Sequence, residues 1–121
     1  ILLVALGGHL ERSRMILLEI SNAERPDDLL AWREPAQRLI ADNRLYRQSA
    51  RLSGEPALAE LLGEVERLLL ELAQAPDGAG AEDLEWLRQR VEERDLVFKV
   101  QVLEGSAKQR NPTVRPASRG L

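Results

Sequence analysis

The sequence has no cysteine and a single histidine, His9. It therefore has no disulfide framework, no thiolate nucleophile and no zinc site of the common Cys and His types within one chain. Aromatic residues make up only 3% of the chain, which predicts a core of leucine, valine and alanine. Because leucine, glutamate and arginine are frequent while β-branched and aromatic residues are few, the composition favours helices over sheets.

The sequence also lacks the motifs of several enzyme classes. It has no GxxxxGK[ST] phosphate loop, no GxGxxG after a strand, no GxSxG turn and no Glu-x-x-His pair of the kind found in di-iron bundles. No set of nucleophile, base and orienting residue can be assembled from the residues that are present. We therefore expect no catalytic residues, no bound metal and no cofactor.

The charge is acidic overall and unevenly distributed. The formal net charge is −3, but residues 105–121 carry four basic residues and no acid, which leaves 13 basic and 20 acidic residues in residues 1–104, a net charge of −7. An acidic body is a poor match to phosphate backbones, so nucleic acid is not an expected partner.

Apolar residues recur about every 3.6 positions in four segments, which predicts four helices. The first runs from near the start of the chain to Ser21 and Asn22 and passes through Gly7 and Gly8, each of which weakens a helix by about 1 kcal/mol relative to alanine. The second runs from Pro35 to a stop at Ser53 and is preceded by a separate short turn near residues 28–33. The third begins at Pro56 and has the clearest apolar stripe, formed by Leu58, Leu61, Leu62, Val65, Leu68, Leu69 and Leu72.

The fourth segment opens with acids and continues as the stripe Leu84, Leu87, Val91, Phe98 and Val102. Residues 96–103 also alternate like a strand, but we expect a helix because no second strand-like run exists to pair with them. Gly105 is expected to end this helix. The predicted organisation is all-α: residues 1–104 form an up-and-down antiparallel four-helix bundle with an extra short turn, and residues 105–121 form a basic, disordered tail.

Four polar residues fall within apolar stripes: His9 and Ser13 in the first helix, and Asn43 and Tyr46 in the second. A buried polar group without a partner costs roughly 1–3 kcal/mol, so we expect these residues to meet across the helix pair. The leading interpretation is a structural hydrogen-bond network that fixes the helix register. The alternatives are a small polar pocket in which His9 takes up a proton or holds a ligand, and a helix phase that leaves some of the four exposed.

Three arginines, Arg44, Arg47 and Arg51, follow the second stripe at helical spacing, and two more, Arg12 and Arg14, lie in the first helix. We expect them to pair with acids of neighbouring helices, and the alternative is a surface that contacts a partner. Three acids of the third helix, Glu60, Glu64 and Glu71, lie opposite its leucines and are expected to face water. The two tryptophans, Trp32 and Trp86, are expected at the core or at helix junctions.

The first seven residues, ILLVALG, are too few to cross a bilayer, which needs about 20, and no basic start marks a secretory signal. Because the chain does not begin with methionine, we expect a processed or excised segment. The stretch then acts either as part of the first helix or as the junction with a membrane segment upstream of Ile1.

Four strings, in this order, carry a resemblance: ILLVALGGHLERSRMILLEI, NRLYRQSA, LLGEVERLLLELAQAP and DLVFKVQVL. They resemble the C-terminal part of a group of bacterial single-pass membrane proteins that are similar to anti-sigma factors. Those proteins have a zinc-finger-like N-terminal region, one membrane helix and a helical domain outside. No metal ligand can be carried over to this chain.

The resemblance implies a non-enzymatic sensor or protein-interaction domain on the extracytoplasmic (periplasmic) face of a bacterial inner membrane. Its partner would be a protein, and its contact with the membrane would be made only through the segment upstream of Ile1. The alternative is a structural or adaptor bundle that self-associates through exposed leucines of the first and fourth helices.

Overall fold

The computed structural model describes residues 3–110, with the side chains of residues 4–107, and this part of the chain is helical without any strand. Residues 96–103 are helical, as predicted. Six helices replace the four predicted helices and the short turn: α1 (Leu3–Asn22), α2 (Pro26–Leu30), α3 (Arg33–Leu52), α4 (Pro56–Ala73), α5 (Ala81–Glu93) and α6 (Leu96–Arg110).

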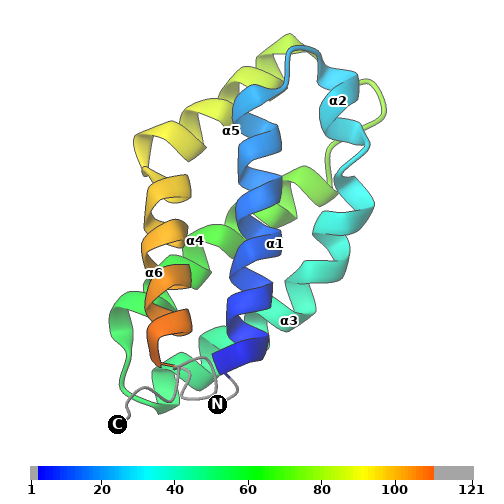
Figure 1. Cartoon of the computed structure of the whole chain (residues 1–121). Helices are drawn as coiled ribbons and strands as arrows, with labels where there is room; N and C mark the ends of the chain where they lie inside the picture. Colours follow the sequence, from blue (N-terminus) through cyan, green and yellow to red (C-terminus); the bar gives the residue numbers. More distant parts are fainter. Residues whose placement is uncertain (1–2, 111–121) are drawn as a thin grey trace, which may run out of the picture.

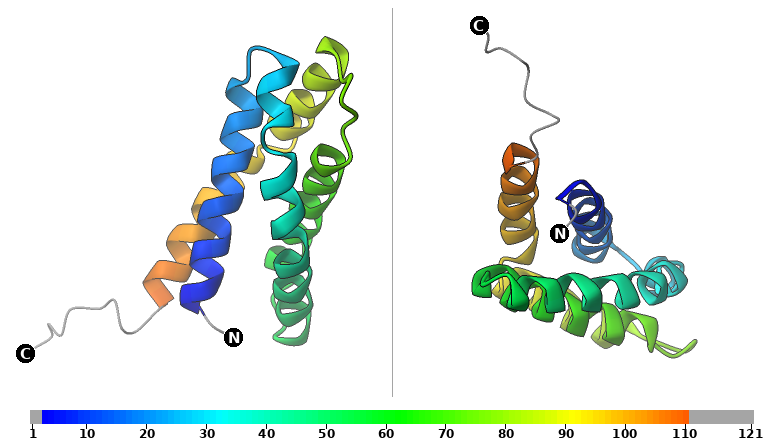
Figure 2. Two further views of the ribbon diagram at one scale, coloured as in Figure 1. Left: turned by 90° about the vertical axis from the view of Figure 1, so that its right-hand side faces the viewer. Right: turned by 90° about the horizontal axis from the view of Figure 1, so that it is seen from below.

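The helices form two antiparallel pairs. A three-residue connection joins α3 to α4 as a helical hairpin, while α1 and α6 come from opposite ends of the sequence and lie side by side (Figure 1). The right-hand view in Figure 2 looks roughly along α1 and α6 and shows this pair lying across the α3–α4 hairpin. Contacts within each pair are much more extensive than the contact between α1 and α3. The interface between the pairs is therefore the more open one.

The stripe of α4 supplies the centre of the core. All seven of its predicted apolar residues are buried, because α3, α5 and α6 pack against the helix. The predicted stripe of α3 is confirmed as well. Tyr46 is half-buried at its edge, and the other members are buried: Ala36, Leu39, Ile40, Asn43 and Ala50. None of the described helices combines the length and the apolar character that a bilayer span requires.

The short turn before α3 is also confirmed. It is the five-residue helix α2, whose Asp28 carboxylate accepts a hydrogen bond from the Arg25 backbone N–H at 3.1 Å. Pro35 then lies in the first turn of α3, where a missing N–H costs nothing because that turn has no intrahelical acceptor. The helix therefore begins at Arg33, two residues before the proline, and the turn at residues 31 and 32 separates it from α2.

The predicted fourth helix is wrong in its continuity. It is interrupted between α5 and α6, where Asp95 adopts a φ of 52° in the left-handed region. This interruption resets the helical phase, so Leu96 and Val100 point inward while Phe98 and Val102 are 58% and 51% exposed. A stripe extrapolated across the break assigned the wrong side of α6 to the core.

The predicted helix end at Gly105 is also wrong, since α6 continues through this residue to Arg110. Glu104 and Ala107 are both buried next to it, so packing against α1 continues past Gly105 and offsets the roughly 1 kcal/mol that a helical glycine costs. Residues 105–110 of the predicted tail are thus helical. The remainder, residues 111–121, lies outside the described residues.

Gly7 and Gly8 lie inside an unbroken α1, as predicted. A Cβ atom at Gly7 would meet nothing within 4 Å, and one at Gly8 would lie 3.4 Å from the flexible end of Arg12. Changing both residues to alanine is expected to raise the free energy of unfolding by roughly 1–2 kcal/mol, because each glycine costs about 1 kcal/mol in a helix.

Urea denaturation would measure this gain, with Gly54→Ala as the matched control. Gly54 follows α3 with a φ of +72°, where a side chain is strained by about 1 kcal/mol, so this change is expected to destabilise the chain. Loss of stability in the Gly7→Ala, Gly8→Ala protein would contradict the unbroken helix.

Candidate functional site

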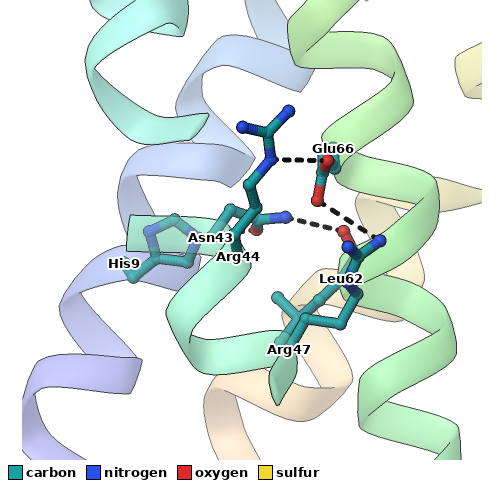
Figure 3. A network of polar contacts seen from close by, with 6 residues as sticks. All are labelled: His9, Asn43, Arg44, Arg47, Leu62 and Glu66. Atoms are coloured by element: carbon teal, nitrogen blue, oxygen red, sulfur yellow. Dashed lines mark hydrogen bonds and ion pairs between the residues drawn. The ribbon is translucent and has the colours of Figure 1, made fainter. Parts of the chain in front are cut away.

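The predicted polar residues build a buried link between three helices. The Nε2 atom of His9 in α1 lies 2.8 Å from the Oδ1 atom of Asn43 in α3, and the Asn43 Nδ2 atom donates to the Leu62 carbonyl of α4 at 2.7 Å. His9 and Asn43 have no exposed surface. Figure 3 shows Asn43 between the other two residues. A single amide thus ties α1 to the hairpin.

The other two predicted members differ in their contacts. The Tyr46 ring lies beside the His9 ring, with centroids 5.0 Å apart. Ser13 is buried as predicted, but its Oγ atom has no hydrogen-bond partner among the described residues, and neither has the His9 Nδ1 atom. The structure therefore brings three of the four together and leaves Ser13 outside the hydrogen-bonded link.

The environment fixes both the charge and the tautomer of His9. Burial lowers its pKa below the usual 6.5 and is the largest effect; the Asn43 hydrogen bond opposes it, Arg12 lowers the pKa further and Asp42 raises it. Because Asn43 donates to Leu62 through Nδ2, its Oδ1 atom must accept from His9, so the His9 proton resides on Nε2. His9 is therefore neutral at pH 7.

Two of the three arginines pair with one buried acid. Glu66 in α4 is 7% exposed, and its carboxylate lies 2.9 Å from Arg44 Nε and 3.3 Å from Arg47 Nη1 (Figure 3). Arg51 is exposed near the end of α3. Arg44 and Arg47 thus pair with a neighbouring helix, and they extend the polar link along the α3–α4 hairpin.

The expectation that Glu60, Glu64 and Glu71 face water is wrong for two of them. Glu64 pairs with Arg94 at 2.9 Å and Lys99 at 3.7 Å, and burial raises the pKa of Glu71 above its usual value. The cause is the break before α6, since α5 and α6 cover this side of α4 as two short helices. Of these three acids, only Glu60 is exposed.

An ion pair joins α1 and α6. The sequence predicted that Arg14 pairs with an acid of another helix, which is confirmed, but it did not identify the acid; the same prediction for Arg12 is wrong, since Arg12 has no ion pair with any described residue. Arg14 Nε lies 2.8 Å from Oε1 of Glu104, which is 6% exposed, and the pKa of Arg14 is raised, chiefly by this hydrogen bond. The signal was present, because Glu104 extends the stripe of Leu96 and Val100. It was hidden by the expected helix end at Gly105.

The two tryptophans occupy different environments. Trp32 is half-buried against the core at the junction of α2 and α3, as expected. Trp86 is 44% exposed on α5, where the Arg90 guanidinium lies 4.9 Å from its ring centre in a cation–π contact. The core or junction prediction is therefore correct for Trp32 and wrong for Trp86.

Two grooves border the inter-helix contacts. One, of about 300 Å³, lies between α4 and α6 and is lined by Phe98, Val102 and Glu60, among others. The other, of about 430 Å³, lies between α1 and α3. His9 lines neither of them, so a ligand in these grooves would not touch the buried link directly.

Within the part of the chain that the structure describes, no group of three or more His, Cys, Asp and Glu side chains is arranged to hold a metal ion. Compared with models of known protein families, with curated proteins and with solved structures, the chain gives no significant match. The functional argument therefore depends on the chain's own residues: a buried three-helix link and two open grooves.

Proposed function

We propose that this chain is a non-enzymatic sensor and protein-interaction domain, and that it forms the extracytoplasmic, periplasmic part of an anti-sigma-like membrane regulator. The observation that carries the interaction role is the α4–α6 groove. Its edge residues Phe98 and Val102 expose more than half of their surface, while Leu61 below them is buried. Exposed apolar surface gathered in a groove is typical of interaction sites.

The charge at this groove selects its occupant. Glu60 is exposed and has no ion-pair partner among the described residues, whereas Glu64 beside it is paired with Arg94 and with Lys99, which also lines the groove. Glu60 is therefore the acid that is open to a partner. We therefore propose an amphipathic helix of a protein partner, with an apolar stripe flanked by lysine or arginine.

The buried position of His9 supports the non-enzymatic role. A general base must come within hydrogen-bond reach of a substrate, and His9 has no surface through which a substrate could approach. Its Nε2 atom is also already engaged with Asn43.

Signal transmission would use α1. This helix is held firmly against α6, where Arg14 pairs with Glu104, and more openly against α3, where His9 contacts Asn43. A partner that binds one packing of α1 better than another shifts the population between them. We further propose that α1, α3, α4 and the α5–α6 unit act as the four arms of an up-and-down bundle, joined to the membrane through a segment upstream of Ile1.

The alternative is a self-associating adaptor bundle, in which a second copy fills the α4–α6 groove. The expected contact through exposed leucines is wrong, since the described leucine side chains of α1, α5 and α6 are buried or half-buried. The large apolar residues that these helices expose, among the described side chains, are Val4, Met15, Trp86, Phe98 and Val102. Dimerisation seen by analytical ultracentrifugation and abolished by Phe98→Asp would favour the adaptor.

Binding of a helical leucine–lysine peptide tests the interaction surface. We expect Phe98→Asp to weaken this binding at least tenfold, because a charge replaces the apolar edge of the groove, whereas Leu52→Asp, on the 82% exposed Leu52 of α3, is expected to leave it unchanged. Fluorescence anisotropy would measure both affinities. Equal binding of a leucine–glutamate peptide would contradict the proposed partner chemistry.

A separate experiment tests the membrane and anti-sigma context. The complete reading frame, expressed with a C-terminal tag, is expected in the inner-membrane fraction with the tag degraded by protease added to spheroplasts. It is also expected to co-purify with a sigma factor. A tag protected from the protease would contradict the periplasmic location.

A further inference from the structure

The second groove, between α1 and α3, has an apolar floor and partly open sides. Ile16 of α1 and Leu39 of α3 form the floor, being 2% and 7% exposed, while Met15 is 49% exposed and Trp32 is half-buried at the sides. Its volume of about 430 Å³ falls within the range of roughly 300–1,000 Å³ that is usual for small-molecule sites. The groove exists because α1 and α3 are the more openly packed helices.

Three charged side chains line the groove, two cations and one acid: Arg12, Arg38 and Asp42. Arg38 is engaged with Glu34 at 3.3 Å, whereas Arg12 is exposed and has no ion pair or hydrogen bond with any described residue. Arg12 therefore offers an uncommitted guanidinium beside an apolar floor.

From this combination we propose that the α1–α3 groove binds a small amphipathic carboxylate. Its apolar body covers Ile16 and Leu39 between Met15 and Trp32, and its carboxylate pairs with Arg12. A cationic amphiphile could pair only with Asp42 and would lie beside both guanidinium groups, and a neutral one would leave Arg12 unused.

The site borders the buried link between α1 and the hairpin. Arg12 lies three residues after His9 in α1, and Asp42 directly precedes Asn43 in α3, so a bound carboxylate changes the charge around His9 and fills the open part of its interface. Binding of a carboxylate in the α1–α3 groove can be measured without any partner protein. Only the idea that occupancy is the sensed signal rests on the proposed function.

Tryptophan fluorescence tests the binding with octanoate, octanol and octylammonium as matched probes. In a Trp86→Phe background, Trp32 is the single tryptophan and lines the groove. We expect octanoate to change its emission saturably and to bind about tenfold more tightly than octanol, because of one charge-assisted pair, with octylammonium the weakest. Equal or tighter binding of octanol or octylammonium would overturn the proposal.

Arg12→Gln is expected to remove the tenfold preference for octanoate over octanol, while Arg51→Gln, at an exposed arginine that does not line the groove, is expected to preserve it. Met15→Glu supplies a second test. An acid at this exposed side repels the carboxylate while Arg12 remains, so octanoate is expected to bind more weakly. The NMR signals of His9, the only histidine, are expected to move with octanoate and with the same affinity. An Arg12→Gln protein that keeps the preference, or unmoved His9 signals, would overturn the site.

Discussion

Replacing Asn43 by alanine is expected to lower the free energy of unfolding by about 3 kcal/mol, the largest effect of any single substitution considered. The change removes both hydrogen bonds of the buried link, leaves His9 Nε2 without a partner and opens a cavity between α1 and the hairpin. Domains of this size are stable by only about 5–15 kcal/mol, so a large share would be lost. Urea denaturation with constant m-value would measure it.

The matched control replaces both hydrogen-bonded side chains by leucine. In the His9→Leu, Asn43→Leu protein neither substitution leaves a donor of the buried link unpaired, and the Leu62 carbonyl remains within the backbone ladder of α4, so most of the stability is expected to return. If the double variant were as unstable as Asn43→Ala, packing volume rather than hydrogen bonding would explain the loss.

Lowering the pH from 7 to 5 is expected to destabilise the native protein through His9. The folded pKa of His9 lies below 6.5 because of burial, so the unfolded chain takes up the proton first. The stability that neutral His9 provides is complete above pH 6.5 and decreases as the pH falls toward the lower folded pKa. Linkage limits the slope to about 1.4 kcal/mol per pH unit.

The difference between the native and His9→Leu proteins isolates this effect. Glu71, whose pKa is raised, acts in the opposite direction, since the stability it costs is recovered as the pH falls, but both proteins contain it. Arg12 and Asp42, which act on the charge of His9, are also common to both. Parallel curves of unfolding free energy against pH would contradict a buried neutral His9.

Much of the fold could be predicted from local patterns. The stripe of α4 gave its buried face because eighteen residues keep one helical phase, and Pro35 gave the boundary between α2 and α3 because proline has a defined place in a first turn. The break at Asp95 could not be predicted in the same way. Aspartate adopts the left-handed conformation only occasionally, so an aspartate in a helical pattern does not by itself mark a break.

The candidate site, too, could be predicted only where it depends on local patterns. His9, Ser13 and Asn43 were found because polar residues in an apolar stripe must be buried, but which atoms pair depends on the register between helices. Ser13 consequently has no partner while Asn43 has two. Glu66 and Glu104 were missed as buried ion-pair partners, because long-range pairing of charges is decided by tertiary packing.

The short connection at Asp95 also determines which changes of chain length the molecule tolerates. Removing one residue there would turn α6 by about 100° about its axis, moving Leu96 and Val100 away from α1 and turning the apolar edge of the α4–α6 groove. The connection between α4 and α5, residues 74–80, is longer and mostly exposed. Related chains should therefore vary in length between α4 and α5 and remain constant between α5 and α6.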